Sequence, residues 1–528
     1  MELIKRNIHM DRERCRAFTQ MTLEDDVIIS DSRPDAAKLI MDRGNVVVDE
    51  VKVTDDHAAV KGKLEFYVLY LTEKGSGAEE KNDVACMEGT IPFEEMVFME
   101  GVKNGDSVNV DWEIEDLSVG MINSRKLSIQ SLLGLSLSCG EISDEETAVD
   151  LYSEEPVEFR KKTLDVAAVA VKKKDIFRIK EEVEIPGSFP NIASMIWSEV
   201  VPGTVEFKAL EDKIALQGEL HAFFLYRGQN ERGQGDEEEI CHYETTLPFA
   251  GSLECGGCRE GMIPEIHLCA QNKDVEVRPD FDGEERVITF EQCLELDICI
   301  YEEDSIDILS DVYGVVKEVA VQEKNADFKR LQGKCSGKAK ISGHFKAQEE
   351  NAMLHKILHT AGKLQIGEKK AVEGGIEITG TVELQIFYEC SNEKERYGVI
   401  RGSIPFQYLL ETDGSLDDCV YPVNACVDQI AVAIIDNQEV DVKCVLYFRA
   451  NIYRKWQEKI VEQIIVTEPD MEKMAALPGI AVYMVREGES LWDIGKRYYV
   501  PVSVIKQTNA LQNDEVRAGD KILIVKGM

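Results

Sequence analysis

The sequence predicts a mainly β protein: three tandem β-sandwich-like domains followed by a small βααβ module. Three observations support this fold class: a motif that recurs three times, apolar residues that alternate with period two before each occurrence, and a C-terminal stretch patterned as strand, two helices and strand. We expect the β domains at residues 1–155, 156–318 and 319–460, a linker at 461–479, and the terminal module at 480–528.

The repeat is carried by a Leu/Ile-Pro-Phe motif that recurs at intervals of about 156 residues. Upstream of each occurrence, a glycine begins a run in which every second residue is apolar or aromatic and a tyrosine ends the row. The period of two predicts a strand with one face in a core. The inward residues that we expect are Leu64, Phe66, Val68 and Tyr70; Leu220, Ala222, Phe224 and Tyr226; and Val382, Leu384, Ile386 and Tyr388.

Each copy begins with a short apolar stretch and ends at a junction. The stretches at Pro34–Arg43, Pro190–Ser198 and Ala352–Leu358 are the candidates for helix in the β domains. The first two copies end in similar tetrapeptides, Asp150-Leu151-Tyr152-Ser153 and Asp311-Val312-Tyr313-Gly314. We interpret these tetrapeptides as the junctions between copies.

The charge and the cysteine content restrict the function classes. The net charge is −39, which argues against binding to nucleic acid or to an anionic membrane. Residues 481–528 carry about +1 and residues 1–480 about −40, so the module is electrically distinct from an acidic body. No signal-peptide core or membrane-length apolar run is visible, and fourteen cysteines in such a chain indicate reduced thiols in a cytosol.

The sequence has no G-x-S-x-G motif and no P-loop, and we expect neither an enzyme nor a cofactor. Cys255 and Cys258 form a lone C-x-x-C, more typical of a loop with two free thiols than of a zinc site. His355 and His359 would share one face of a helix, but the glutamate of a zinc protease motif is missing. Acidic runs at 236–239 and 349–350 are interpreted as solvated loop tips, with Ca²⁺ as the open alternative.

The C-terminal module can be followed residue by residue. A strand at 482–485 precedes Ser490, which is placed to cap a helix with Asp493 as its capping-box partner. Leu491 and Ile494 would share the buried face of that helix. A second helix begins near Pro501, and a strand at 521–525 closes the unit.

This stretch resembles the LysM module, through Gly488-Glu489-Ser490-Leu491-Trp492, Asn509-x-Leu511 and Ala518-Gly519-Asp520. The resemblance implies binding of N-acetylglucosamine polymers such as peptidoglycan or chitin. It assigns the glycan to two loops, formed by Gly488, Glu489 and Ser490 and by Asn509, Ala510 and Leu511. Gly495 and Tyr499 depart from the family pattern, which has alanine and a small residue there.

An apolar group on the module predicts a protein partner as well. Ile480, Trp492, Tyr499 and Val504 are the candidate partner-binding residues, because an exposed apolar patch on so small a unit more often meets a protein than a polar sugar chain. The alternative for Trp492 is that its ring folds back over its own helix.

The three repeats resemble the SPOCS domain, through the Gly-to-Tyr strand, the Leu/Ile-Pro-Phe motif and the Asp-x-Tyr junction. The whole arrangement is similar to the SipL-like family of spore coat morphogenetic proteins. The resemblance implies a non-enzymatic scaffold in the mother-cell cytoplasm, at the surface of the forespore. There its LysM module would bind a SpoIVA-like coat-basement ATPase, and its β domains would contact other coat proteins. A peptidoglycan- or N-acetylglucosamine-binding cell-wall protein is the alternative.

Overall fold

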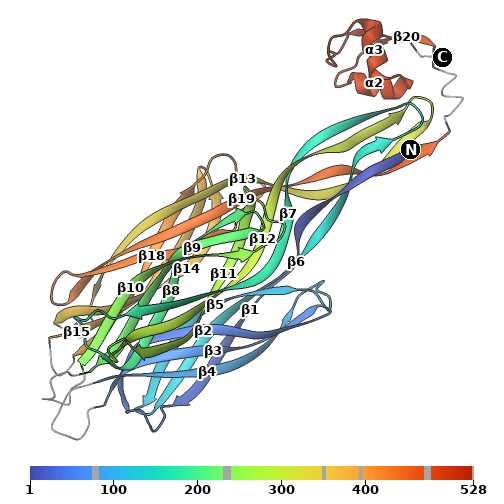
Figure 1. Ribbon diagram of the computed structural model, residues 1–528. Helices are drawn as coiled ribbons and strands as arrows, with labels where there is room; N and C mark the ends of the chain where they lie inside the picture. The colour runs from blue at the N-terminus through green and yellow to red at the C-terminus, as the bar shows by residue number, and fades with distance from the viewer. Residues whose placement is uncertain (74–82, 230–238, 348–352, 392–395, 469–476, 526–528) are drawn as a thin grey trace.

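The computed structural model describes residues 1–73, 83–229, 239–347, 353–391, 396–468 and 477–525 (Figure 1). The mainly β fold class is confirmed: antiparallel strands form three double-sheet domains, and within these residues the helices lie in the C-terminal module. Figure 1 shows the sheets side by side in an elongated body, with the module beyond one end of it.

The first domain is a sandwich of two three-stranded sheets. One sheet has the order β1-β6-β5, with bounds Glu2–Ile28, Lys126–Tyr152 and Val108–Asn123. The other has the order β2-β3-β4, with bounds Ala36–Thr54, His57–Thr72 and Val84–Phe98.

The second and third domains repeat this plan. In the second, the sheets are β7-β12-β11 and β8-β9-β10, with bounds Val157–Glu184, Glu285–Gly314, Ile263–Pro279, Ile192–Leu210, Lys213–Gly228 and Glu239–Glu254. In the third, β13 and β14 take the places of β7 and β8. Its strands are β13 to β19, with bounds Glu318–Lys346, Leu354–Val372, Gly375–Cys390, Tyr397–Glu411, Cys419–Val420, Val423–Ile434 and Glu439–Thr467.

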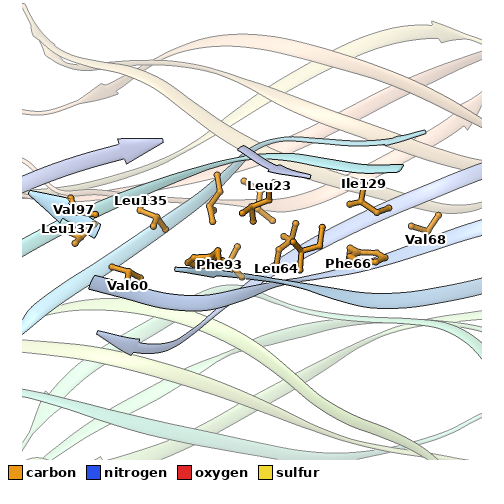
Figure 2. Close-up of a cluster of buried hydrophobic side chains, with 14 of the residues drawn as sticks. Leu23, Val60, Leu64, Phe66, Val68, Phe93, Val97, Ile129, Leu135 and Leu137 are labelled. Carbon is orange, nitrogen blue, oxygen red and sulfur yellow. The ribbon is translucent and has the colours of Figure 1, made fainter. Parts of the chain in front are cut away.

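The middle strand of each smaller sheet supplies the predicted inward face. All twelve residues that the period of two selects are buried in the sandwich cores, and the prediction is confirmed. Figure 2 shows Leu64, Phe66 and Val68 among the side chains of the opposite sheet in the first domain. The period of two identifies the buried residues because successive side chains of a strand point to opposite faces of the sheet.

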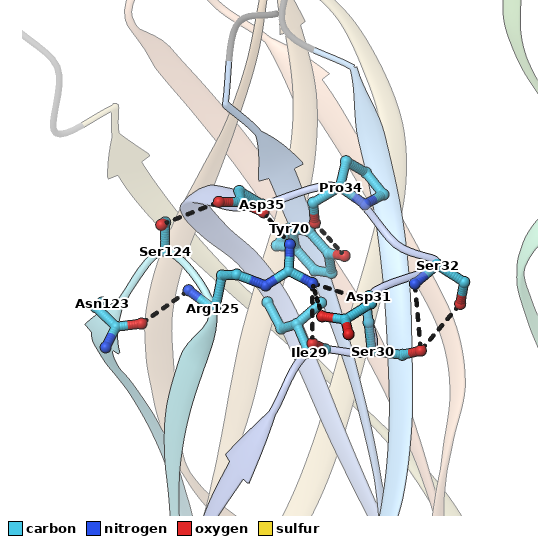
Figure 3. A network of polar contacts seen from close by, with 10 residues as sticks. All are labelled: Ile29, Ser30, Asp31, Ser32, Pro34, Asp35, Tyr70, Asn123, Ser124 and Arg125. Atoms are coloured by element: carbon cyan, nitrogen blue, oxygen red, sulfur yellow. Dashed lines mark hydrogen bonds and ion pairs between the residues drawn. The ribbon is translucent and has the colours of Figure 1, made fainter.

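In the first two copies, the tyrosine at the end of the row donates a hydrogen bond to a loop carbonyl group. The hydroxyl of Tyr70 donates to the carbonyl of Pro34 at 3.1 Å, and Tyr226 donates to Pro190 at 3.2 Å. Arg125 holds the same loop from the other side, through Asp35 and the carbonyl groups of Ile29 and Ser30 (Figure 3). These bonds satisfy loop carbonyls that no strand pairs.

The helices expected at Pro34–Arg43, Pro190–Ser198 and Ala352–Leu358 are wrong. Residues from Ala36, Ile192 and Leu354 onward form β2, β8 and β14. Each strand begins with two register shifts against its neighbour, and each shift interrupts the period of two. The irregular spacing of apolar residues that suggested helix is therefore the spacing of a bulged strand.

The outer faces of the three smaller sheets form a further core where the domains meet. Leu69, Leu225 and Phe387 occupy the same position of the repeat, and all three are buried in this cluster. Met41, Trp197 and His359 are another equivalent set, each opposite one of those residues in the sheet register. The three repeats thus pack around one another and bury a shared surface.

Pairs of long strands extend beyond the sandwiches. β1 with β6, β7 with β12, and β13 with β19 form ribbons, and two clusters of buried residues hold the three ribbons together. β19 continues to Thr467, so the first residues of the expected linker at 461–479 are strand. The ribbons lead to the end of the body where the module lies (Figure 1).

Candidate binding surface on the terminal module

The module has the βααβ order that its sequence predicts. β20 (Ile480–Met484) pairs with β21 (Lys521–Val525), and α2 (Leu491–Tyr498) and α3 (Val502–Asn509) lie between them in sequence. Its own small core contains Val485, Leu491, Ile494, Val500, Ile505, Ile522 and Ile524.

The first helix begins and ends at well-defined caps. The Ser490 hydroxyl accepts from the Asp493 backbone N–H, and the Asp493 carboxylate accepts from the Ser490 backbone N–H at 2.9 Å. Tyr499 ends the helix in the left-handed conformation with φ of 56°. The predicted capping box is confirmed.

The four candidate partner-binding residues do not form one exposed surface. Ile480 is 69% exposed and Val504 is 37% exposed. Tyr499, expected to be exposed, is buried at 8%, and Trp492 is half-buried. The expectation fails because Tyr499 sits at the tight turn between the helices and Trp492 lies against the second β domain.

Trp492 and Lys496 of α2 contact the end of β12. The Trp492 indole Nε1 donates to Asp311 Oδ2 at 2.8 Å, and Lys496 Nζ donates to both oxygens of the same carboxylate at 2.7 and 2.8 Å. The Trp492 ring meets Tyr313 edge to face, with ring centroids 4.8 Å apart. The Tyr313 hydroxyl donates to the Val500 carbonyl at 2.9 Å. We call Asp311 and Tyr313 the docking pair.

Gly495 makes this close approach possible. A Cβ at this position would lie 2.6 Å from the Tyr313 hydroxyl oxygen and 2.8 Å from the Val500 carbonyl oxygen. The departure of Gly495 from the family alanine therefore has a physical reason in this chain. The tyrosine reaches the turn after α2 through the space that a side chain would fill.

Charges around the docking pair favour the contact. Hydrogen bonds from Ser490 hold the pKa of the Asp493 carboxyl below its usual value, and the positive charge of Arg160 on β7 contributes to the same shift. Burial raises the pKa of Tyr313, so its hydroxyl is protonated and able to donate. The acidic body thus meets the module where the module carries Lys496.

In the two loops assigned to glycan, the polar side chains are occupied within the module. Glu489 accepts hydrogen bonds from the Tyr483 hydroxyl and the Arg486 backbone N–H, and pairs with Arg497 at 2.7 Å. Burial alone would raise its pKa, but these contacts outweigh it and lower the pKa to about 2. The Asn509 side chain donates to the Ile505 and Leu523 carbonyls and accepts from the Leu523 N–H. Gly488 and Ala510 are exposed, while Ser490 and Leu511 are half-buried.

The C-x-x-C sequence is part of a structural turn. Cys255 and Cys258 are buried at the end of the second sandwich, and the Cys258 backbone N–H donates to the Cys255 carbonyl. Met99 and Val102 occupy the same turn in the first domain, with the same backbone bond. The two cysteines are therefore small core residues, and burial raises the pKa of both thiols.

The predicted histidine pair is separated in the structure. Both residues lie on strand β14 instead of a helix, with His355 exposed and His359 buried. His359 bonds to Glu199 at 3.0 Å and Glu244 at 3.3 Å and stacks on Phe223. It joins the third domain to the second. The acidic runs fall mostly outside the described residues, at 236–238 and 349–350.

The described residues contain no group of three or more His, Cys, Asp or Glu side chains placed to hold a metal ion. No helix in the same part of the chain is long and apolar enough to cross a membrane.

Sequence reasoning identified the docking pair only as a junction between repeats. The signal was present, because Asp-x-Tyr occurs at the end of two copies. What the pattern could not give is the contact partner, because Trp492 and Tyr313 are distant in sequence and meet only in the folded chain.

Two family models match parts of the chain. The model of the SipL SPOCS domain matches residues 35–122, 191–278 and 354–435, the strands from β2 to β5 in the first domain and their equivalents in the others. The model of the LysM domain matches residues 483–525. No curated protein and no solved structure matches the chain. Both domain types are non-catalytic binding domains. The chain is thus a protein of the SipL family, with three SPOCS domains and a C-terminal LysM domain.

Proposed function

We propose that this protein is a non-enzymatic scaffold of the spore coat, which holds the coat to the forespore through binding of its LysM domain to a SpoIVA-like coat-basement ATPase. The three SPOCS domains would present surfaces to other coat proteins on the mother-cell side. The observation that carries the proposal is that the LysM domain already docks on a protein surface, through Trp492, Lys496 and Tyr313.

The chemistry of the α2 surface favours a protein partner. It combines an aromatic ring, an indole donor, a lysine and the backbone carbonyl of Val500, a set that matches an acidic side chain beside an aromatic one. The outer residues Ile480 and Val504 add apolar area on other parts of the module. The loops offer few free side-chain donors and acceptors to a glycan, because those of Glu489 and Asn509 are used inside the module.

Binding of peptidoglycan or another N-acetylglucosamine polymer is the second candidate function. It is favoured by the family match over 483–525, which includes both loops, and by the exposure of Gly488 and Ala510. Backbone groups of these loops would then supply the contacts to sugar.

The test is a binding titration of the full-length chain against a purified SpoIVA-like ATPase and, in parallel, against chitopentaose and peptidoglycan fragments. Three variants accompany the wild type: Trp492→Glu, Val504→Glu, and the double change Asp311→Asn with Tyr313→Ser. The double change leaves the module intact and removes its contact with the body.

The outcomes distinguish the two protein-binding surfaces from glycan binding. If the ATPase uses the α2 surface, the double change strengthens binding because the surface is no longer covered, and Trp492→Glu abolishes it. If the ATPase uses the Val504 side of the module, Val504→Glu abolishes binding and the double change has little effect. Saturable glycan binding with no response to the ATPase contradicts the proposal and supports the second candidate.

A further inference from the structure

The chain contains a second copy of the docking pair, at Asp150 and Tyr152 in the first domain. In both domains the aspartate follows a one-residue bulge, at Val149 in β6 and at Ser310 in β12. In both, the aspartate accepts a hydrogen bond from the backbone N–H of the next residue, at 2.9 and 2.8 Å. The sheets therefore hold the two Asp-x-Tyr motifs in the same local geometry.

The strand opposite each motif is also similar. Glu2 pairs with Tyr152 in the register of β1 and β6, and Glu158 pairs with Tyr313 in that of β7 and β12. One neighbour differs, because Ile4 stands opposite Asp150 where Arg160 stands opposite Asp311. The third domain has no such pair, since Gln463 and Ile465 occupy the equivalent positions after its own bulge.

The two copies of the motif differ in occupancy. Asp311 and Tyr313 are covered by the LysM domain, whereas the Tyr152 side chain is 62% exposed. Asp150 pairs with Lys161 at 3.2 Å, and the side chains of both are partly exposed. Ile4 and Phe159 add exposed apolar side chains at this end of the body. An aromatic residue and an acid in a geometry that binds α2 elsewhere in the chain thus face solvent.

We propose that Asp150 and Tyr152 bind the LysM domain of a second copy of this chain. Lys496 and the Trp492 indole would bond to the Asp150 carboxylate, with Lys496 replacing Lys161. The Tyr152 ring would fit the space beside Gly495. The occupant is identified by the complementarity that the same module already has with Asp311 and Tyr313. The charges agree, because the body carries about −40 and residues 481–528 about +1.

Such a contact joins two different surfaces of the chain, so two copies that form it still have one free module and one free site. Each copy offers one module and one Asp150/Tyr152 site, and copies would add head to tail into open chains. The intramolecular docking pair competes for the same module at a high effective concentration. Isolated molecules would therefore stay monomeric in dilute solution, and assembly would begin where copies are concentrated. This inference does not depend on the identity of the coat partner.

The test uses two full-length variants, each able to play one role. The donor has Asp150→Asn, Tyr152→Ser, Asp311→Asn and Tyr313→Ser, so only its module remains competent. The acceptor has Asp311→Asn, Tyr313→Ser and Lys496→Glu, so only Asp150 and Tyr152 remain. Sedimentation velocity is measured for each alone, for the mixture, and for the wild type over a wide concentration range, with circular dichroism as the check of folding.

We expect each variant alone to be monomeric and the mixture to form a 1:1 dimer. Adding Asp150→Asn and Tyr152→Ser to the acceptor should weaken that dimer at least about tenfold, as expected for loss of a hydrogen-bonded charged contact. The wild type should form longer species only at high concentration. A mixture that stays monomeric, or a dimer that survives the change at Asp150 and Tyr152, would overturn the proposal. The proposal would also be overturned if the module bound Tyr152 of its own chain, at every protein concentration.

Discussion

The cores of the three sandwiches and the surfaces between the domains differ in how closely their residues repeat from copy to copy. Inside, the same positions carry similar side chains in every copy: Tyr70, Tyr226 and Tyr388 are all buried at the end of the same strand. Between domains, one repeat position holds Met41, Trp197 and His359, which differ in size and charge. A repeated core needs the same shape three times, whereas each outer face meets a different neighbour. Positions with similar residues in all three copies therefore belong to the sandwich cores, and positions with different residues belong to the contacts between domains.

The largest expected effect comes from breaking a repeated core position. Phe66→Ala should lower the free energy of unfolding of the first domain by about 3–5 kcal/mol, because it removes a fully buried ring and leaves a cavity. Urea unfolding of the full-length chain measures the change. Lys61→Ala, an exposed residue on the same strand, is the matched control and should change the stability by less than about 0.5 kcal/mol. Equal loss in both variants would show that the period of two does not mark the core.

The next effect concerns the inter-domain position that differs in each copy. His359→Gln removes one partner of the buried ion pair with Glu199 and leaves that carboxylate without its imidazolium, which should cost about 3 kcal/mol. Burial alone would lower the pKa of His359, but the hydrogen bonds that its ring donates to the Glu199 and Glu244 carboxylates outweigh it, and the net shift is upward. The protonated form therefore stabilises the native state.

The sign of this shift fixes the pH dependence. The stabilisation is complete below about pH 6.5, the ordinary pKa of histidine, and is lost as the pH rises through the higher native pKa. The difference between wild type and His359→Gln should therefore be largest in mild acid and narrow in alkali. Thermal unfolding over a pH series measures it. His355→Gln, the exposed histidine of the same strand, should leave the profile unchanged.

The sequence predicted the strands in which apolar and polar residues alternate without interruption. The prediction was wrong where a bulge interrupts that alternation. Leu64, Phe66 and Val68 could be assigned because nothing disturbs the period of two along β3. The start of β2 was taken for helix because register shifts after Ala36 and Leu39 break that period. The bulges also aim Ile40 and Met41 at the inter-domain core, a destination that no single-strand pattern contains.

The candidate site was predictable to the same extent. The LysM strands, caps and core follow from local spacing, so these could be read along the chain. The exposure of Trp492 could not, because it depends on Asp311 and Tyr313 in another domain. Tyr499 was expected in an exposed apolar patch with Trp492 and Val504, and the left-handed turn that buries it has no glycine to signal it.

A smaller effect should come from the tyrosine hydroxyl groups that the repeats share. Tyr70→Phe removes the hydrogen bond to the Pro34 carbonyl and should cost about 1 kcal/mol, since the rest of the ring stays packed. Tyr226→Phe should cost the same, because it makes the same bond to Pro190. Chemical denaturation compares both with Tyr152→Phe, whose exposed hydroxyl should contribute almost nothing. Unequal costs for Tyr70 and Tyr226 would mean that the repeats do not use this bond alike.

The smallest effect on stability is expected for Asp311→Asn. This change also tests most directly how the two Asp-x-Tyr motifs differ. The ion pair with Lys496 is partly exposed, so its loss should cost at most about 1 kcal/mol. The position of the module should change far more than the stability, because Asp311 accepts from both Trp492 and Lys496. Hydrogen exchange of α2 and of the end of β12 should therefore accelerate, and added salt should have a similar effect on the wild type by screening the pair. Asp150→Asn is the matched control, and it should leave exchange at α2 unchanged in dilute solution because the equivalent motif there holds no module of its own chain.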